Sequence, residues 1–202
     1  MPNLNAPRGF VPSRYLDGSS WNGAANTYYI DQADTNIMSP GDAVKSSTLT
    51  DINGVPGITK ALGTDTVRGV IIGFMTAPWY GNTFSGTNLD LTLQNIPATK
   101  TKSYYALVVD DPSMVFELQD NGLSVIASTS MNKNFTFTVA NPTAPAVNSA
   151  TVLLNSSVGT ANTLNLRLIG AMQRDDNDRT SVNAKWLVRF NQHELMGGTA
   201  GV

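Results

Sequence analysis

The sequence predicts a mainly β protein, built from antiparallel β-sandwich, jelly-roll or small-barrel elements and carrying an extended N-terminal arm. Two observations indicate this. From Asn26 onward, short apolar stretches alternate with turn residues, and no stretch has the spacing of an amphipathic helix. The polar residues are also mostly uncharged, with 20 Asn and 22 Thr against 14% charged residues. Threonine favours strands, while Asn and Gly favour the turns between them.

The N-terminal residues 1–22 differ from the rest of the chain. Pro2, Pro7 and Pro12 recur at regular intervals, which excludes a helix and favours an extended path. The segment has two interpretations: a frayed terminus, or an arm that lies on a neighbouring subunit and becomes ordered there. For the second interpretation, the candidate contact residues are Arg8, Phe10, Arg14 and Tyr15.

The remaining residues divide into two predicted β-subdomains, 23–100 and 101–202. The Asn53-Gly54 pair predicts a hairpin. The continuous apolar run at 67–75 predicts a strand buried on both faces, and Gly69 and Gly73 within it indicate bulges or close backbone approach. Further strands are predicted at 27–30, 43–47, 89–94, 104–109, 114–119, 123–127, 135–140, 151–154, 164–169 and 185–190.

A Gly-, Asn- and Ser-rich stretch at 78–88 interrupts the strand pattern. It predicts a long surface loop or a junction between the two subdomains. Its aromatic residues Trp79, Tyr80 and Phe84 have two interpretations, an exposed contact tip or a local core beneath the loop.

Composition restricts the partners of the chain. The net charge is -2 and the pI is near 5.2, which argues against a general nucleic-acid binder. The N-terminus lacks the apolar stretch of a signal peptide, and no apolar run approaches the ~20 residues of a membrane helix. We therefore expect a protein made in the cytoplasm that binds neither nucleic acid nor membrane directly.

Few residues are suited to catalysis. The chain has no Cys, a single His (His193) and two Glu (Glu117 and Glu194), and it lacks the phosphate-binding and nucleophile-elbow motifs. Two acidic clusters remain, at 110–111 and 175–178. The second lacks the spacing of a calcium-binding loop and is better interpreted as a solvated loop whose charge Arg174 and Arg179 offset. The sequence thus predicts no enzyme, no metal and no cofactor.

Several stretches together resemble one family, the capsid cement (decoration) proteins of tailed bacteriophages. They occur in order and span most of the chain: RGFVPSRYLDGS at 8–19, GDAVK at 41–45, VRGVIIGF at 67–74, VDDPSMVFELQ at 109–119, RDDND at 174–178 and AKWLVRFNQH at 184–193. The resemblance implies a virion protein that binds the outer surface of the expanded head. Its implied partners are the major capsid protein and further copies of itself, with a homotrimer favoured.

Two other functions stay open at the level of sequence. A tail or surface β-domain that recognises a host carbohydrate would need Trp79, Tyr80 or Trp21 exposed in a groove. A hydrolase with paired carboxylates would need Asp110 and Asp175 in one pocket.

Overall fold

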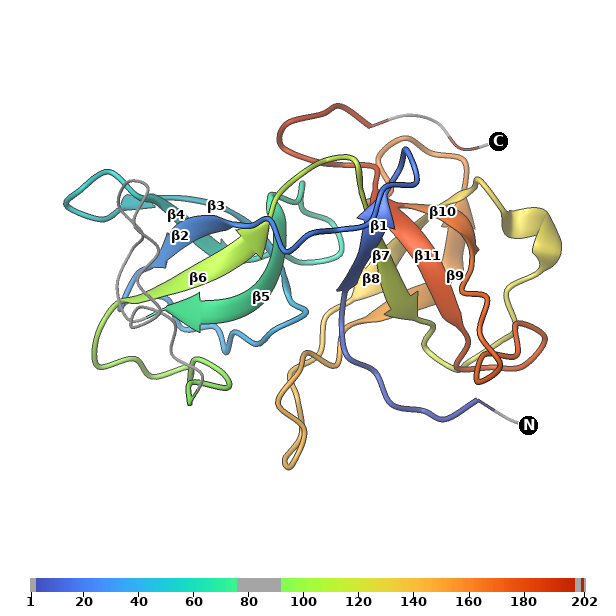
Figure 1. Cartoon of the computed structure of the whole chain (residues 1–202), viewed down its shortest axis with the longest axis horizontal. Helices are drawn as coiled ribbons and strands as arrows, with labels where there is room; N and C mark the ends of the chain where they lie inside the picture. Colours follow the sequence, from blue (N-terminus) through green and yellow to red (C-terminus); the bar gives the residue numbers. More distant parts are fainter. Residues whose placement is uncertain (1–2, 76–91, 199–200, 202) are drawn as a thin grey trace.

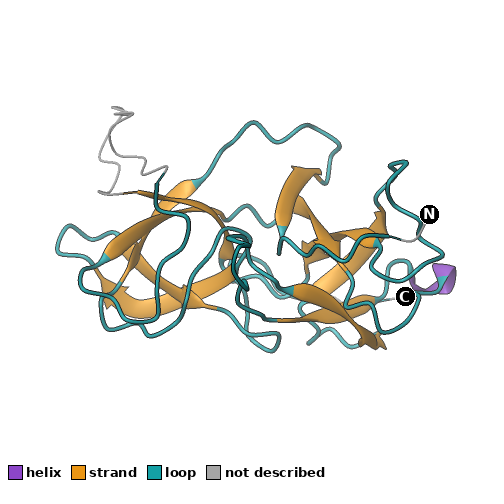
Figure 2. Cartoon of the chain, turned by 90° about the horizontal axis from the view of Figure 1, so that it is seen from below, coloured by secondary structure: helices purple, strands orange, loops and turns teal. Residues whose placement is uncertain are grey.

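The computed structural model describes residues 3–75, 92–198 and 201. These residues form a nearly all-β protein whose only helix is one 3-10 turn, η1 (Ser128–Ser130) (Figure 2). The predicted mainly β class is therefore confirmed. The strands form two groups that lie side by side, a closed barrel and a six-stranded sheet (Figure 1).

The barrel closes in the order β2-β4-β3-β5-β6, which confirms the predicted small-barrel element. All of its pairs are antiparallel except β2 with β4. Its interior is apolar, with Ile30, Val44 and Ile71 completely buried. The strands are β2 (Asn26–Ile30), β3 (Ala43–Thr50), β4 (Pro56–Lys60), β5 (Gly69–Met75) and β6 (Tyr104–Val109).

The six-stranded sheet has the order β1-β7-β11-β10-β8-β9. It curls on itself, because a parallel bridge from Asp120 to Leu153 brings β9 back beside the end of β7. Its inner face holds Phe116, Phe135 and Trp186, each at most 1% exposed. The strands are β1 (Val11–Tyr15), β7 (Met114–Gln119), β8 (Asn134–Thr138), β9 (Val152–Gly159), β10 (Leu166–Ala171) and β11 (Lys185–Phe190).

One apolar core crosses from the barrel into the six-stranded sheet. Ala43, Val67 and Val70 on the barrel side belong to the same buried cluster as the inner face of the sheet. Val67 also pairs with the segment after β11: its N–H donates to the carbonyl of Gln192 at 3.0 Å, and its carbonyl accepts from Glu194 at 2.9 Å. Because the two groups of strands share a core and a backbone ladder, they form one body.

Polar side chains also connect the barrel to the six-stranded sheet, at a place that we call the joint. The hydroxyl of Tyr28 donates to Asp110 at 2.6 Å and accepts from Nε of Arg68 at 2.8 Å. Desolvation, followed by the hydrogen bond to Asp110, raises the pKa of Tyr28 to about 12. The carboxylate of Glu194 accepts from the backbone and hydroxyl of Ser46. The joint therefore ties β2, β3, the turn after β6 and the end of the chain together.

The glycine and hairpin predictions agree with the structure. β3 and β4 form an antiparallel hairpin around Asn53-Gly54, where Gly54 has a φ of 83°. At Gly69 an added Cβ would lie 2.4 Å from the carbonyl oxygen of Val109, which is the predicted close approach. At Gly73 the register between β5 and β6 shifts, which is the predicted irregularity.

One predicted strand is not observed, and a second lies partly outside the described residues. Residues 123–127 form a loop, in which Leu123 is 79% exposed. This loop is tied to β9 by a bond from the side chain of Asn155 to the carbonyl of Ser124, and of its apolar side chains Leu123 and Val125 are exposed while Ile126 enters the core. Within the predicted strand 89–94, the described residues 92–94 are not strand.

The N-terminal segment is extended, as predicted, but much of it belongs to the fold of its own chain. β1 is an edge strand paired with β7, a position that tolerates Pro12. The chain passes from the barrel to the six-stranded sheet at the turn 110–113, and β1 joins the sheet of the C-terminal half.

Candidate functional site

A groove lies between the N-terminal segment and the loop that follows β10. It has a volume of about 650 Å³ and is partly open to solvent. The predicted contact residue Arg8 and part of the predicted acidic loop line it together. The lining residues are Leu4, Ala6, Arg8, Gly9, Val11, Glu117, Gln119, Arg174, Asp175, Asp176 and Lys185.

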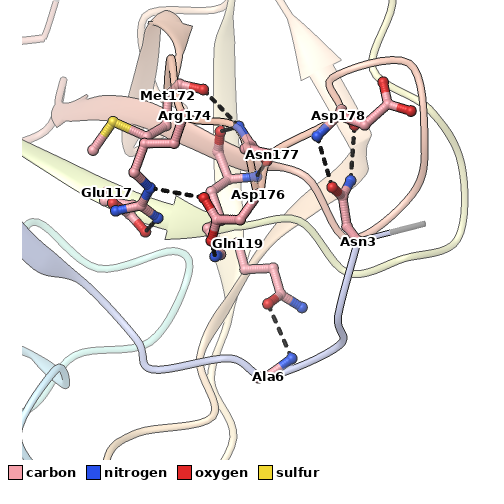
Figure 3. A network of polar contacts seen from close by, with 10 residues as sticks. Asn3, Ala6, Glu117, Gln119, Met172, Arg174, Asp176, Asn177 and Asp178 are labelled. Carbon is pink, nitrogen blue, oxygen red and sulfur yellow. Dashed lines mark hydrogen bonds and ion pairs between the residues drawn. The ribbon is translucent and has the colours of Figure 1, made fainter. Parts of the chain in front are cut away.

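Amide side chains hold the N-terminal segment in place along this groove (Figure 3). The side chain of Asn3 donates to the carbonyl of Asp178 at 2.8 Å and accepts from the N–H of the same residue at 2.7 Å. Further along, Gln119 accepts from the N–H of Ala6 at 3.1 Å and donates to Asn5 at 2.9 Å. Both sets of hydrogen bonds involve only backbone groups and neutral amide side chains. The N-terminal segment is therefore held in place by uncharged groups.

The loop at 172–178 is shaped by Asn177 and Asp178. The amide of Asn177 donates to the carbonyls of Met172 and Lys185 at 2.8 and 2.9 Å and accepts from the N–H of Lys185 at 2.8 Å. The carboxylate of Asp178 accepts from the hydroxyl and N–H of Thr180, and these bonds lower its pKa to about 2. The loop is therefore closed by its own side chains.

A chain of ion pairs forms the floor of the groove. Arg174 donates to Glu117 at 2.8 Å and to Asp176 at 3.2 Å, and Lys185 lies 2.8 Å from the other oxygen of Asp176. The hydrogen bond to Glu117 raises the pKa of Arg174, and the bond from Lys185 lowers the pKa of Asp176. The predicted offsetting of the acidic cluster by Arg174 is thus observed. Lys185, which was not predicted, supplies the second cation.

The four predicted arm residues point in different directions. Arg8 is exposed at the groove, and Arg14 is half-buried on β1. Phe10 is 1% exposed and lies in the core of its own chain, and Tyr15 packs against the same core. In this structure Phe10 is therefore not a contact with a neighbouring subunit. The N–H of Phe10 donates to the carbonyl of Gly41 at 2.9 Å, and its ring packs against Phe116, Phe137 and Phe190.

Of the aromatic residues proposed for a contact loop or for sugar recognition, the structure describes only Trp21. Trp79, Tyr80 and Phe84 lie outside the described residues. Trp21 is half-buried against the core of the six-stranded sheet, and its Nε1 donates to the carbonyl of Ala24 at 3.1 Å.

The two acidic clusters are not assembled into one site. Asp110 and Asp111 line a depression beside Tyr15 and Met75, whereas Asp175 and Asp176 line the groove described above. The hydrolase hypothesis therefore lacks the shared pocket that it requires. Within residues 3–75, 92–198 and 201, no three His, Asp or Glu side chains gather as metal ligands would.

No protein-family model, curated protein or solved structure matches the chain. The resemblance to cement proteins therefore rests on the sequence stretches alone. No helix in the part of the chain that the structure describes has the length and apolarity needed to cross a bilayer.

Proposed function

We propose that this chain is a virion structural protein that binds the outer surface of the expanded head of a tailed bacteriophage. In this role it binds the major capsid protein as a homo-oligomer, with a trimer favoured, and stabilises the shell against the pressure of the packaged DNA. It performs no chemistry and needs no cofactor.

One observation carries the proposal: the stretches that resemble cement proteins contact one another. β1 from the first stretch pairs with β7, and β7 pairs with β11 from the last. The carbonyl of Gly41 accepts from the N–H of Phe10 at 2.9 Å. Arg174 bonds to Glu117, and Arg68 lies 3.6 Å from Asp110. The similar residues are thus those that hold the fold together, which supports a resemblance of the whole protein rather than of isolated motifs.

The physical character of the fold also supports this role. A protein that braces a shell must transmit force without deforming, and a continuous core across two strand groups resists relative motion. A ligand that binds only the mature lattice stabilises that lattice by mass action. Repeated sites on one shell add to this effect through effective concentration.

The test is co-sedimentation of the purified chain with immature and with expanded heads from which accessory proteins have been stripped. We expect saturable binding to expanded heads alone, together with a higher melting temperature of the shell. Absence of binding to both forms would refute the proposal, and a glycan-binding screen would then test the carbohydrate alternative.

A further inference from the structure

A row of arginine side chains crosses the outer face of the six-stranded sheet. The β1–β7 register sets Arg14 opposite Val115. β7 also pairs with β11, with Val188 opposite Phe116. Continuing this register by one residue places Arg189 opposite Val115, on the side of β7 away from β1. On β10, Arg167 lies directly opposite Arg189. Because directly paired residues of a sheet point to the same face, these three arginines form one row around Val115.

The row lies on the face that points away from the core. Val115 is completely buried, yet it is absent from the core cluster that contains its neighbours Met114 and Phe116. Val115 is therefore covered from outside the core, and the long aliphatic stems of the flanking arginines are suited to do so. Arg14 and Arg189 are half-buried, so their guanidinium groups still reach solvent.

Folding alone does not account for the charges of Arg14 and Arg189, whereas Arg167 donates from its Nε to the side-chain oxygen of Asn134 at 3.1 Å. Like charges directly opposite one another destabilise a sheet. Burial, and after it the charge of Arg167, lowers the pKa of Arg189. Neither Arg14 nor Arg189 forms an ion pair with any carboxylate in the described residues. On the same face, by contrast, Arg174 bonds to Glu117 at 2.8 Å.

We propose that Arg14 and Arg189 of this row form a docking surface for an acidic segment of a protein partner. The planar guanidinium fork matches a carboxylate in two parallel hydrogen bonds. If the proposed function holds, the acidic segment belongs to the major capsid protein, and the row identifies the face that lies on the shell.

The surroundings of the row favour a protein over a nucleic acid. A nucleic acid requires a long basic track, because its affinity comes from many neutralised phosphates. Here the row is short, the chain carries a net charge of -2, and Glu117 and Asp176 lie on the adjoining groove. A short acidic segment is the ligand that fits such a surface.

The test compares two double variants that remove the same charge. Arg14→Gln/Arg189→Gln shortens each side chain only modestly and removes two charges of the row. Lys102→Gln/Arg179→Gln removes two exposed charges elsewhere. Binding is measured by fluorescence anisotropy with a short labelled polyglutamate peptide, with duplex DNA as competitor, and by co-sedimentation with expanded heads. Melting temperatures are recorded for all three proteins.

We expect the row variant to bind the peptide and the heads about tenfold more weakly than the parent, since exposed ion pairs contribute modestly and add. The control should bind like the parent, and salt should weaken parental binding. The melting temperature of the row variant should be unchanged or higher. Equal binding by the two variants, or preference for DNA over the peptide, would overturn the inference.

The outcomes separate this inference from the proposed function. Peptide binding that depends on the row, without binding of the parent protein to heads, would retain the docking surface and refute the capsid role. Head binding that is the same for the parent and the row variant, with peptide binding also unchanged, would refute the docking surface and retain the capsid role. A lower melting temperature with unchanged binding would mean that the arginines only cover Val115.

Discussion

The ring of Phe10 lies 5.0 Å from the ring of Phe190, centroid to centroid, although the two residues are 180 positions apart in the chain. Phe10 also meets Phe137 edge to face, with a centroid distance of 5.3 Å. The N-terminal segment thus contributes an aromatic ring to the centre of the core. Such packed rings contribute both buried area and favourable edge-to-face contacts.

We predict that Phe10→Ala lowers the free energy of unfolding by about 3–5 kcal/mol, the usual effect of removing a fully buried Phe. Urea unfolding followed by circular dichroism measures the change. Arg8→Ala is the matched control, since this neighbouring side chain is exposed and should change stability by about 0.5 kcal/mol or less. Similar effects of the two substitutions would contradict the placement of Phe10 in the core.

Local patterns predicted many of the strands well. β6, β7 and β11 have the bounds that their apolar runs indicate, and the turn between β6 and β7 follows from Asp111-Pro112. The pattern failed at 123–127, where the chain forms a loop with Leu123 and Val125 exposed and only Ile126 buried. Composition alone does not distinguish an exposed apolar run from a strand, because the difference depends on what the rest of the chain packs against.

Long-range pairing is the part that the sequence did not reveal. The proline spacing of residues 1–22 correctly indicated an extended path, but nothing local to β1 identifies β7, about a hundred residues away, as its partner. The same holds for the candidate site. Arg14 was a predicted contact residue, whereas Arg189 and Arg167 became its neighbours only through the register of three other strands.

Two glycines allow a matched test of how tightly the N-terminal segment is held. Gly41 and Gly18 have nearly equal φ values, 91° and 92°, so alanine at either position should cost about 1–2 kcal/mol of backbone strain. At Gly41 an added Cβ would also lie 2.3 Å from the carbonyl oxygen of Arg8, whereas at Gly18 it meets nothing within 4 Å.

We therefore predict that Gly41→Ala is more destabilising than Gly18→Ala by about 1–3 kcal/mol, the range for overpacking. The clash should also weaken the bond from the N–H of Phe10 to the carbonyl of Gly41. Urea unfolding of both variants measures the difference. Equal destabilisation would mean that residues 8–10 move away from Gly41 at little cost.

His193 makes the stability of the joint depend on pH. It is 3% exposed, and its Nδ1 accepts from the N–H of Leu195 at 3.1 Å. Burial, and then the charge of Arg68, lowers the pKa of His193 from its ordinary 6.5. The unfolded chain therefore binds a proton at higher pH than the folded chain. Stability from this group is complete above pH 6.5 and decreases as the pH falls below that value.

We predict that the free energy of unfolding decreases below pH 6.5 by at most about 1.4 kcal/mol per pH unit on account of His193. His193→Asn is the control, because its side-chain oxygen still offers an acceptor to Leu195 but does not titrate. The carboxylates titrate in both proteins, so the difference between their pH profiles isolates the histidine. Parallel profiles would mean that His193 is protonated as easily in the folded chain as in the unfolded one.

Two N-terminal deletions separate the surface part of the segment from its core part. Removal of residues 1–7 eliminates the bonds of Asn3 to Asp178 and of Gln119 to Asn5 and Ala6. We expect a folded protein that is about 1–2 kcal/mol less stable, since these hydrogen bonds are only part-buried and the net contribution of each is modest. Removal of residues 1–16 also eliminates Phe10 and β1.

The longer deletion should expose both the core and the edge of β7, and we expect it to aggregate or unfold, because an exposed strand edge beside apolar surface pairs with other chains. Size-exclusion chromatography and thermal melting distinguish the two outcomes. Only the shorter deletion can therefore report on head binding without loss of the fold. A monomeric, cooperatively melting protein after the longer deletion would show that β1 is a dispensable arm, and would restore the interpretation of residues 1–16 as a segment that becomes ordered on a neighbouring subunit.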